Sequence, residues 1–65
     1  MMDGILWQHD VIVREYKKKR EQAEKYMRKG DKDYADICAW YADGIAYVYM
    51  QLFGKSIADA KYIYE

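Results

Sequence analysis

The sequence predicts an all-α fold, an antiparallel helical hairpin with a short C-terminal helix, completed by dimerisation into a helical bundle. Three observations lead to this prediction. Apolar residues recur at spacings of three and four along two long segments, which is the period of a helix with a buried face. The 65 residues include no proline, and two of the four glycines, Gly30 and Gly54, stand where these segments end. No sustained alternation of apolar and polar residues indicates a strand.

The first helix is expected over about residues 4–29. Asp3 can cap its start by accepting a hydrogen bond from a free backbone N–H. Gly30 can adopt the left-handed conformation that often ends a helix. The apolar stripe expected to face the second helix consists of Met2, Ile5, His9, Ile12, Val13, Tyr16, Ala23, Tyr26 and Met27.

The second helix is expected over about residues 32–53, capped by Asp31 or Asp33 and ended by Gly54. The connection between the two helices is about three residues long, and such short connections make neighbouring helices antiparallel. The stripe expected to form the seam of the hairpin consists of Tyr34, Ile37, Cys38, Tyr41, Ile45, Val48, Tyr49 and Leu52.

A short third helix is expected over about residues 57–64, because Ser56 and Asp59 have the spacing of a capping box. It should fold onto one end of the hairpin. The chain as a whole, residues 1–65, is expected to form a single small domain.

The second helix is apolar on more than one side, and a helix that is apolar all round is buried by something. A domain of 65 residues is marginally stable alone, so we expect a homodimer. One alternative is that the third helix and Trp7 cover the second side within the chain, although a short helix can cover only part of it. The residues expected to contact a protein partner are Trp40, Tyr47, Met50, Gly44 and Trp7.

No arrangement of residues predicts catalysis, a metal, a cofactor or a small-molecule substrate. His9 is the only histidine, and it is expected in the core or the seam, with its side chain diverging from that of the adjacent Asp10. Cys38 is the only cysteine and is expected to be a buried structural thiol. We therefore expect a protein that is not an enzyme.

A cytoplasmic location is expected. The first residues lack the basic and apolar segments of a secretory signal. The longest uncharged stretch, residues 44–54, is too short to span a bilayer, which needs about 20 apolar residues. A single thiol is compatible with a reducing compartment.

Basic residues share the side of the first helix opposite its apolar stripe, and a basic stripe can follow phosphates. Glu15, Glu21 and Glu24 interrupt or flank them, so surface pairing at helical spacing is the simpler interpretation. The candidates for phosphate contact are Arg14, Lys17, Lys18, Lys25 and Arg28.

The run Ala35-Asp36-Ile37-Cys38 after the turn, with the seam spacing that follows it, resembles the Rop-type RNA-binding helical hairpins. The resemblance is architectural and implies a dimeric four-helix bundle. The first helix departs from the pattern: its stripe runs in a shifted register through Tyr16 and Ala23. Arg14 stands where Rop-type proteins carry an exposed aromatic residue on their RNA-binding face.

The function expected from these features is that of a small non-catalytic protein–protein interaction module. It would act as a regulator, inhibitor or adaptor, and its compactness suggests a phage or plasmid origin. The partners would be a second copy and a further, unidentified protein. The alternative is a Rop-like RNA-binding dimer that uses the basic side of the first helix.

Overall fold

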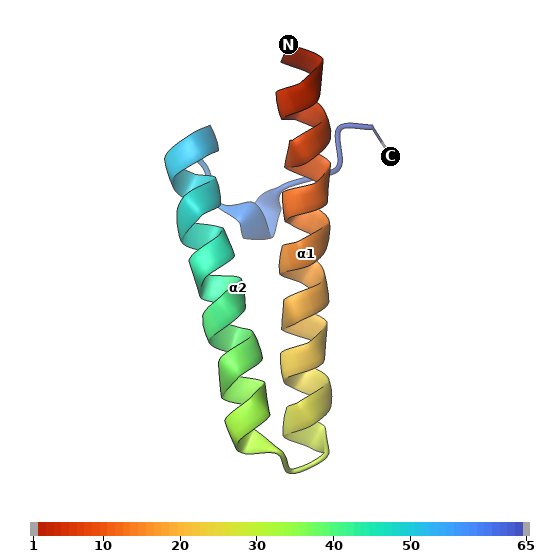
Figure 1. The fold of residues 1–65 in the computed structure, drawn as a ribbon, viewed down its shortest axis with the longest axis vertical. Helices are drawn as coiled ribbons and strands as arrows, with labels where there is room; N and C mark the ends of the chain where they lie inside the picture. The colour runs from red at the N-terminus through yellow and green to blue at the C-terminus, as the bar shows by residue number, and fades with distance from the viewer. Residues whose placement is uncertain (1, 65) are drawn as a thin grey trace.

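Two long helices form an antiparallel hairpin, with a short 3-10 helix near its open end (Figure 1). The computed structural model describes the backbone of residues 2–64 and the side chains of residues 8–64. The helices are α1 (Met2–Arg28), α2 (Lys32–Phe53) and the 3-10 helix η1 (Ile57–Asp59). Residues 2–64 contain no strand, so the prediction of an all-α hairpin is confirmed.

The turn between the helices is formed as the sequence predicts. Gly30 has a φ of +85°. Its N–H donates to the Met27 carbonyl at 3.1 Å, and the Asp31 N–H donates to the Tyr26 carbonyl at 2.9 Å. This is the Schellman arrangement, which satisfies carbonyls that the end of a helix leaves free. The Asp31 carboxylate then accepts from the Tyr34 N–H at 3.2 Å and caps α2.

The ends of the helices differ in one place from the prediction. Helix α1 begins at Met2, so Asp3 lies inside its first turn and the predicted cap is wrong. The end of α2 is as predicted: Gly54 has a φ of +70°, and its N–H donates to the Met50 carbonyl at 2.8 Å.

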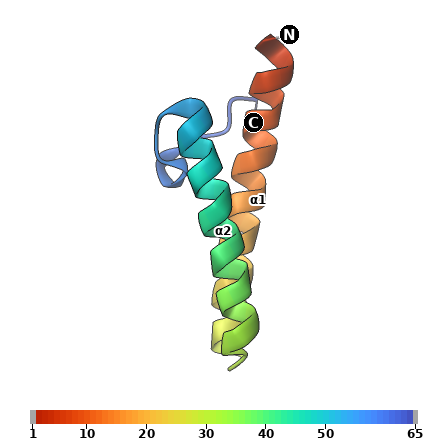
Figure 2. The same ribbon diagram turned by 60° about the vertical axis from the view of Figure 1, so that its left-hand side comes forward.

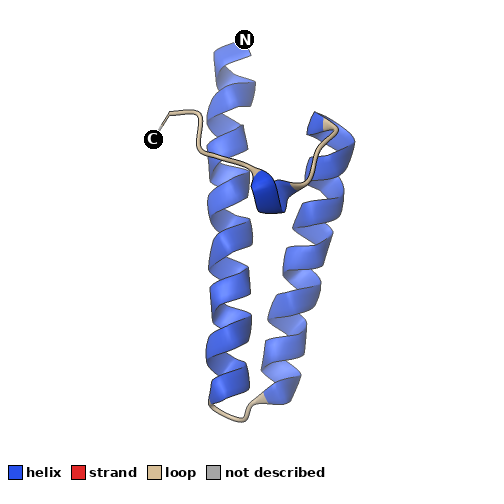
Figure 3. Cartoon of the chain, turned by 180° about the vertical axis from the view of Figure 1, so that it is seen from behind, coloured by secondary structure: helices blue, strands red, loops and turns tan. Residues whose placement is uncertain are grey.

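The predicted third helix over residues 57–64 is wrong beyond its first turn. Ser56 does cap the segment, because its hydroxyl accepts from the Ala58 N–H at 3.3 Å. The 3-10 helix ends at Asp59, and Ala60 is extended, with φ −74° and ψ 141°. A helix of two turns is not stable by itself. Residues 60–64 instead cross α1 without helical structure (Figure 3).

The core lies at the open end of the hairpin, where the two helices diverge and η1 covers the space between them from one side (Figure 1). Figure 2 shows η1 to one side of the plane of the hairpin. The buried residues of this core are Val13, Tyr49, Ile57 and Ala60. Nearer the turn, the helices approach each other through the small buried side chains of Ala35, Cys38 and Ala42.

This packing corrects the predicted seam of α2. Cys38, Ile45 and Tyr49 lie at or near the contact with α1, as predicted. The buried side is centred on small residues, however, and the larger apolar residues beside it are turned toward solvent. The residues wrongly assigned to the seam are Ile37, Val48 and Leu52, which are exposed. Tyr34 and Tyr41 are also largely exposed, but each contacts α1: the Tyr34 ring packs against that of Tyr26 with centroids 4.4 Å apart, and Lys19 Nζ lies 4.9 Å from the centre of the Tyr41 ring.

Candidate protein-binding face

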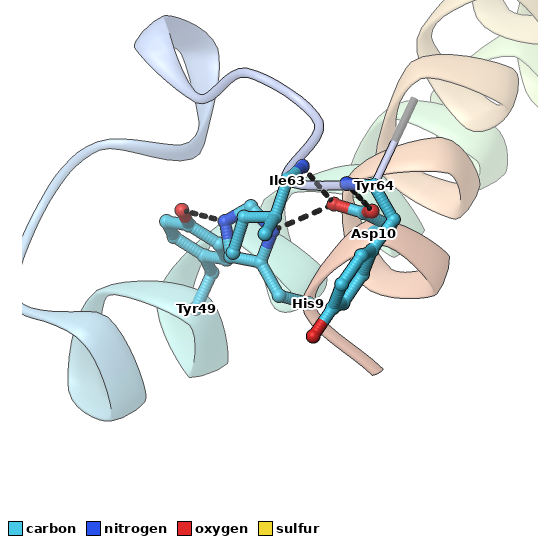
Figure 4. A network of polar contacts seen from close by, with 5 residues as sticks. All are labelled: His9, Asp10, Tyr49, Ile63 and Tyr64. Carbon is cyan, nitrogen blue, oxygen red and sulfur yellow. Dashed lines mark hydrogen bonds and ion pairs between the residues drawn. The ribbon is translucent and has the colours of Figure 1, made fainter. Parts of the chain in front are cut away.

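A buried polar network links α1, α2 and the C-terminal segment (Figure 4). His9 Nε2 lies 2.7 Å from the Tyr49 hydroxyl oxygen, and His9 Nδ1 lies 3.1 Å from Asp10 Oδ1. The Asp10 carboxylate also accepts from the backbone N–H groups of Ile63 and Tyr64, at 2.6 and 2.7 Å. The expectation that the side chains of His9 and Asp10 diverge is therefore wrong. The C-terminal segment supplies Asp10 with partners that draw it toward the core.

The burial of this network indicates that it stabilises the fold. His9 and Asp10 are only 3% and 4% exposed, and Tyr49 is fully buried. The ring of Phe53 packs edge-on to that of His9, with centroids 5.0 Å apart. Among the described residues, no buried side-chain nitrogen or oxygen lacks a hydrogen-bond partner. The network therefore joins three segments of the chain at no cost in unsatisfied polar groups.

Burial and hydrogen bonding act in opposite directions on Asp10. Burial favours the neutral acid and would raise its pKa. The two backbone N–H groups, the hydrogen bond to His9 and the charge of His9 outweigh burial, and hold the pKa of Asp10 below its ordinary value of 3.8. Burial raises the pKa of the Tyr49 hydroxyl above its ordinary value of 10.0. The folded state thus favours ionised Asp10 and neutral Tyr49.

The Cys38 thiol is buried, as the sequence predicts. It lies on the side of α2 that faces α1, between Ala35 and Ala42. In the part of the chain that the structure describes, no three acidic, histidine or cysteine side chains gather into a possible metal site.

Exposed apolar and aromatic residues gather on the side of α2 that is turned away from the core. We define the α2 face as Ile37, Trp40, Tyr41, Gly44, Tyr47, Val48 and Leu52. Each of these residues is exposed. Trp40 and Tyr47 are 69% and 68% exposed, although Trp and Tyr are among the residues with most to gain from burial.

Part of this face is hollowed. A shallow groove of about 510 Å³ lies between α2 and α1, with Ile12 as the α1 residue on its wall. The α2 residues that line it are Trp40, Tyr41, Gly44, Ile45 and Val48. A Cβ added to Gly44 would meet no atom within 4 Å, so another backbone could approach closely there. The groove is therefore an apolar depression with Gly44 on its wall.

The residues predicted to contact a protein are distributed as follows. Trp40, Gly44 and Tyr47 belong to the α2 face. Met50, one turn after Tyr47, is exposed at its margin. The side chain of Trp7 lies outside the described residues. The covering of this side by a third helix does not occur, because Ile57 and Ala60 pack against Val13 and Tyr49.

The basic residues of α1 form a separate surface. Lys17 Nζ lies 4.7 Å from the centre of the Tyr62 ring, and Arg14 Cζ lies 5.7 Å from it. Two of the basic side chains thus also contact the C-terminal segment. The five candidates for phosphate contact, Arg14, Lys17, Lys18, Lys25 and Arg28, are all exposed.

Sequence reasoning missed two features of this region. It assigned Ile37 and Val48 to the seam, although the small residues at positions 35, 38 and 42 share a helical spacing of three and four that marks the closer contact. It also missed the role of Asp10, for which the only signal was an acidic residue beside an apolar stripe.

The fold and the face define a class of protein: a small helical hairpin that presents an uncovered aromatic surface on one helix. No protein-family model, no curated protein and no solved structure matches the chain. No described helix is both long and apolar enough to cross a bilayer.

Proposed function

We propose that the chain is a small non-catalytic protein–protein interaction module, a regulator, inhibitor or adaptor, that binds through the α2 face. The observation that supports this proposal is the exposure of Trp40, Tyr41 and Tyr47 on one helix. Aromatic residues are enriched at the centre of protein interfaces and carry much of their binding energy. Large apolar patches on a monomer are typical of interaction sites.

The charge on α2 supports the same proposal. Between residues 37 and 52 the only charged residue is Asp43, and helical spacing places it at the margin of the face, three residues from Trp40 and four from Tyr47. Charged residues are depleted at the core of interfaces and surround it at the rim. The α2 face has this composition.

RNA binding through the basic side of α1 is the second candidate. The observation in its favour is that Lys18, Lys25 and Arg28 are exposed on that helix. Phosphate contacts would make such binding strongly dependent on salt. Binding through the aromatic α2 face would depend on salt only weakly.

Affinity capture from an extract of the source cell tests the proposal. The immobilised chain is compared with two double variants, Trp40→Ala with Tyr47→Ala and Lys18→Ala with Lys25→Ala. All four residues are exposed, so both variants should fold. We expect the wild type and the lysine variant to retain a protein partner at 0.5 M salt, and the aromatic variant to lose it. Capture of nucleic acid that is lost in the lysine variant and in salt would instead support RNA binding.

A further inference from the structure

We propose that the α2 face binds the same face of a second copy of this chain, with the two α2 helices antiparallel and crossing at Gly44. The inference rests on the proposed function, because it names a partner for that face. In such a pairing, a residue that stands a given number of positions before Gly44 lies opposite the partner's residue that stands the same number of positions after Gly44. The contact is isologous and closes at two copies.

The surface area of the chain supports a second copy. The monomer has an accessible surface of 5064 Å². A compact monomer of 7.8 kDa exposes about 4,400 Å². The difference, about 700 Å², is close to the roughly 800 Å² that each partner buries in an interface of standard size. One further copy would therefore cover the excess.

The shape of the molecule supports the same conclusion. Its radius of gyration is 13.0 Å, and its extents are 43 × 22 × 18 Å. A compact domain of this length has a radius of gyration of about 10.7 Å. A second hairpin packed against the α2 face, with its helices antiparallel to the first, would thicken a short dimension and leave the long one unchanged.

The α2 face is complementary to itself about Gly44. Gly44 leaves a gap in the middle of the face, since no atom lies within 4 Å of where its Cβ would be. Large side chains stand one turn away on either side. In the antiparallel pairing, Trp40 packs against the partner's Val48, and Tyr41 packs against the partner's Tyr47. The glycines meet at the crossing point, where the helix axes can approach closely.

Charges at the two ends of α2 select the antiparallel direction. Asp33 is in the first turn of α2, and Lys55 lies two positions after its last residue, Phe53; both are exposed. Antiparallel pairing about Gly44 brings Asp33 beside the partner's Lys55 at each end of the contact. A parallel symmetric pairing would instead bring Asp33 beside the partner's Asp33. The helix dipoles also oppose each other favourably when the helices are antiparallel.

Sedimentation equilibrium of the full chain tests whether this contact exists. The wild type should have about twice the chain mass at micromolar concentration, the range expected for an interface of this size. Gly44→Leu should return it to the monomer mass. A Cβ at this exposed position meets no other side chain within 4 Å, and leucine favours a helix more than glycine does, so the variant should keep its helical content. Lys18→Leu, which places the same side chain at an exposed position of α1, should remain dimeric.

A charge exchange tests the direction of the helices. Asp33→Lys should weaken the dimer about three- to tenfold at low salt, the range of two exposed ion pairs replaced by like charges. Adding Lys55→Asp to the same chain should restore the affinity, because every subunit then carries both exchanged charges. Antiparallel pairing is contradicted if Asp33→Lys leaves the affinity of the dimer unchanged. It is also contradicted if the added Lys55→Asp does not restore that affinity.

The outcomes separate this inference from the proposed function. A chain that remains monomeric at about 1 mM, where even weak self-association is visible, overturns the second copy. The proposed function then stands if the Trp40→Ala and Tyr47→Ala variant loses a different captured protein. A dimer that is insensitive to Gly44→Leu uses another surface and overturns this inference, while the capture experiment still decides the proposed function.

Discussion

The Asp10 carboxylate accepts a hydrogen bond of 2.6 Å from the backbone N–H of Ile63, a residue 53 positions further along the chain. With the adjacent bond from Tyr64, it is the polar contact that ties the C-terminal segment to α1. The apolar contact is made by Ile57 and Ala60, which pack against Val13 and Tyr49. Beyond η1, the C-terminal segment thus forms no helix of its own and is held in place by contacts with both long helices.

Loss of the Asp10 carboxylate should free the end of the C-terminal segment. In Asp10→Ala, the amides of Ile63 and Tyr64 lose their acceptors and should exchange with solvent much faster. The helices should persist, because Ile57 stays buried. Amide hydrogen exchange by NMR measures this. Asp59→Ala, at an exposed acidic position of η1, is the matched control and should leave these two amides protected.

Acid should destabilise the fold through the same residue. The folded-state pKa of Asp10 is lower than its unfolded value, so its contribution to stability is complete above the ordinary value of 3.8. That contribution is lost as the pH falls through the lowered folded-state pKa. Urea denaturation between pH 6 and pH 2 should show a decline in the unfolding free energy. Asp10→Asn has no carboxylate at position 10 to bind a proton, so its unfolding free energy should decline less. An equal decline in both proteins would count against this role of Asp10.

Removal of the Tyr49 hydroxyl should destabilise the core. Tyr49→Phe leaves His9 Nε2 buried without its partner at 2.7 Å. An unsatisfied buried polar group costs about 1–3 kcal/mol. Urea denaturation at pH 7 measures the change. Tyr47→Phe removes the same hydroxyl from an exposed ring and should alter the unfolding free energy by no more than about 0.5 kcal/mol.

The Cys38 thiol should be protected in the folded protein. It is buried against α1, so a thiol reagent should label it slowly until denaturant is added. Cys38→Ala should cost about 1–2 kcal/mol, the scale of a small truncation in a core. Rapid labelling of the native chain would show that the packing of the two helices near the turn is wrong.

The long helices and their ends, apart from the start of α1, could be predicted because local signals determine them. Helix α2 spans Lys32–Phe53, the range predicted, and its caps at Asp31 and Gly54 follow from the chemistry of those residues alone. The turn at Gly30 needs a positive φ, which glycine adopts without strain. Each of these features depends on contacts within a few residues.

The orientation of α2 and the path of the C-terminal segment could not be predicted because they depend on distant contacts. Most positions of α2 are apolar, so the periodicity defines no single buried side. Close packing at Ala35 and Ala42 then decides which side faces α1. The capping pattern at Ser56 was correct, yet it could not show that Asp10 would bind the backbone of Ile63 and Tyr64.

The central claim is that the α2 faces of two copies pack antiparallel, and an isotope-filtered NMR experiment tests it most directly. A sample that mixes labelled and unlabelled chains detects only contacts between copies. Trp40 and Val48 are eight residues apart on one helix, about 12 Å along its axis, so a strong cross-peak between them cannot arise within one chain. The account predicts an intermolecular cross-peak from the Trp40 ring to the Val48 methyl groups. Cross-peaks from Trp40 to the partner's Trp40, or contacts between copies that involve only α1, would contradict it.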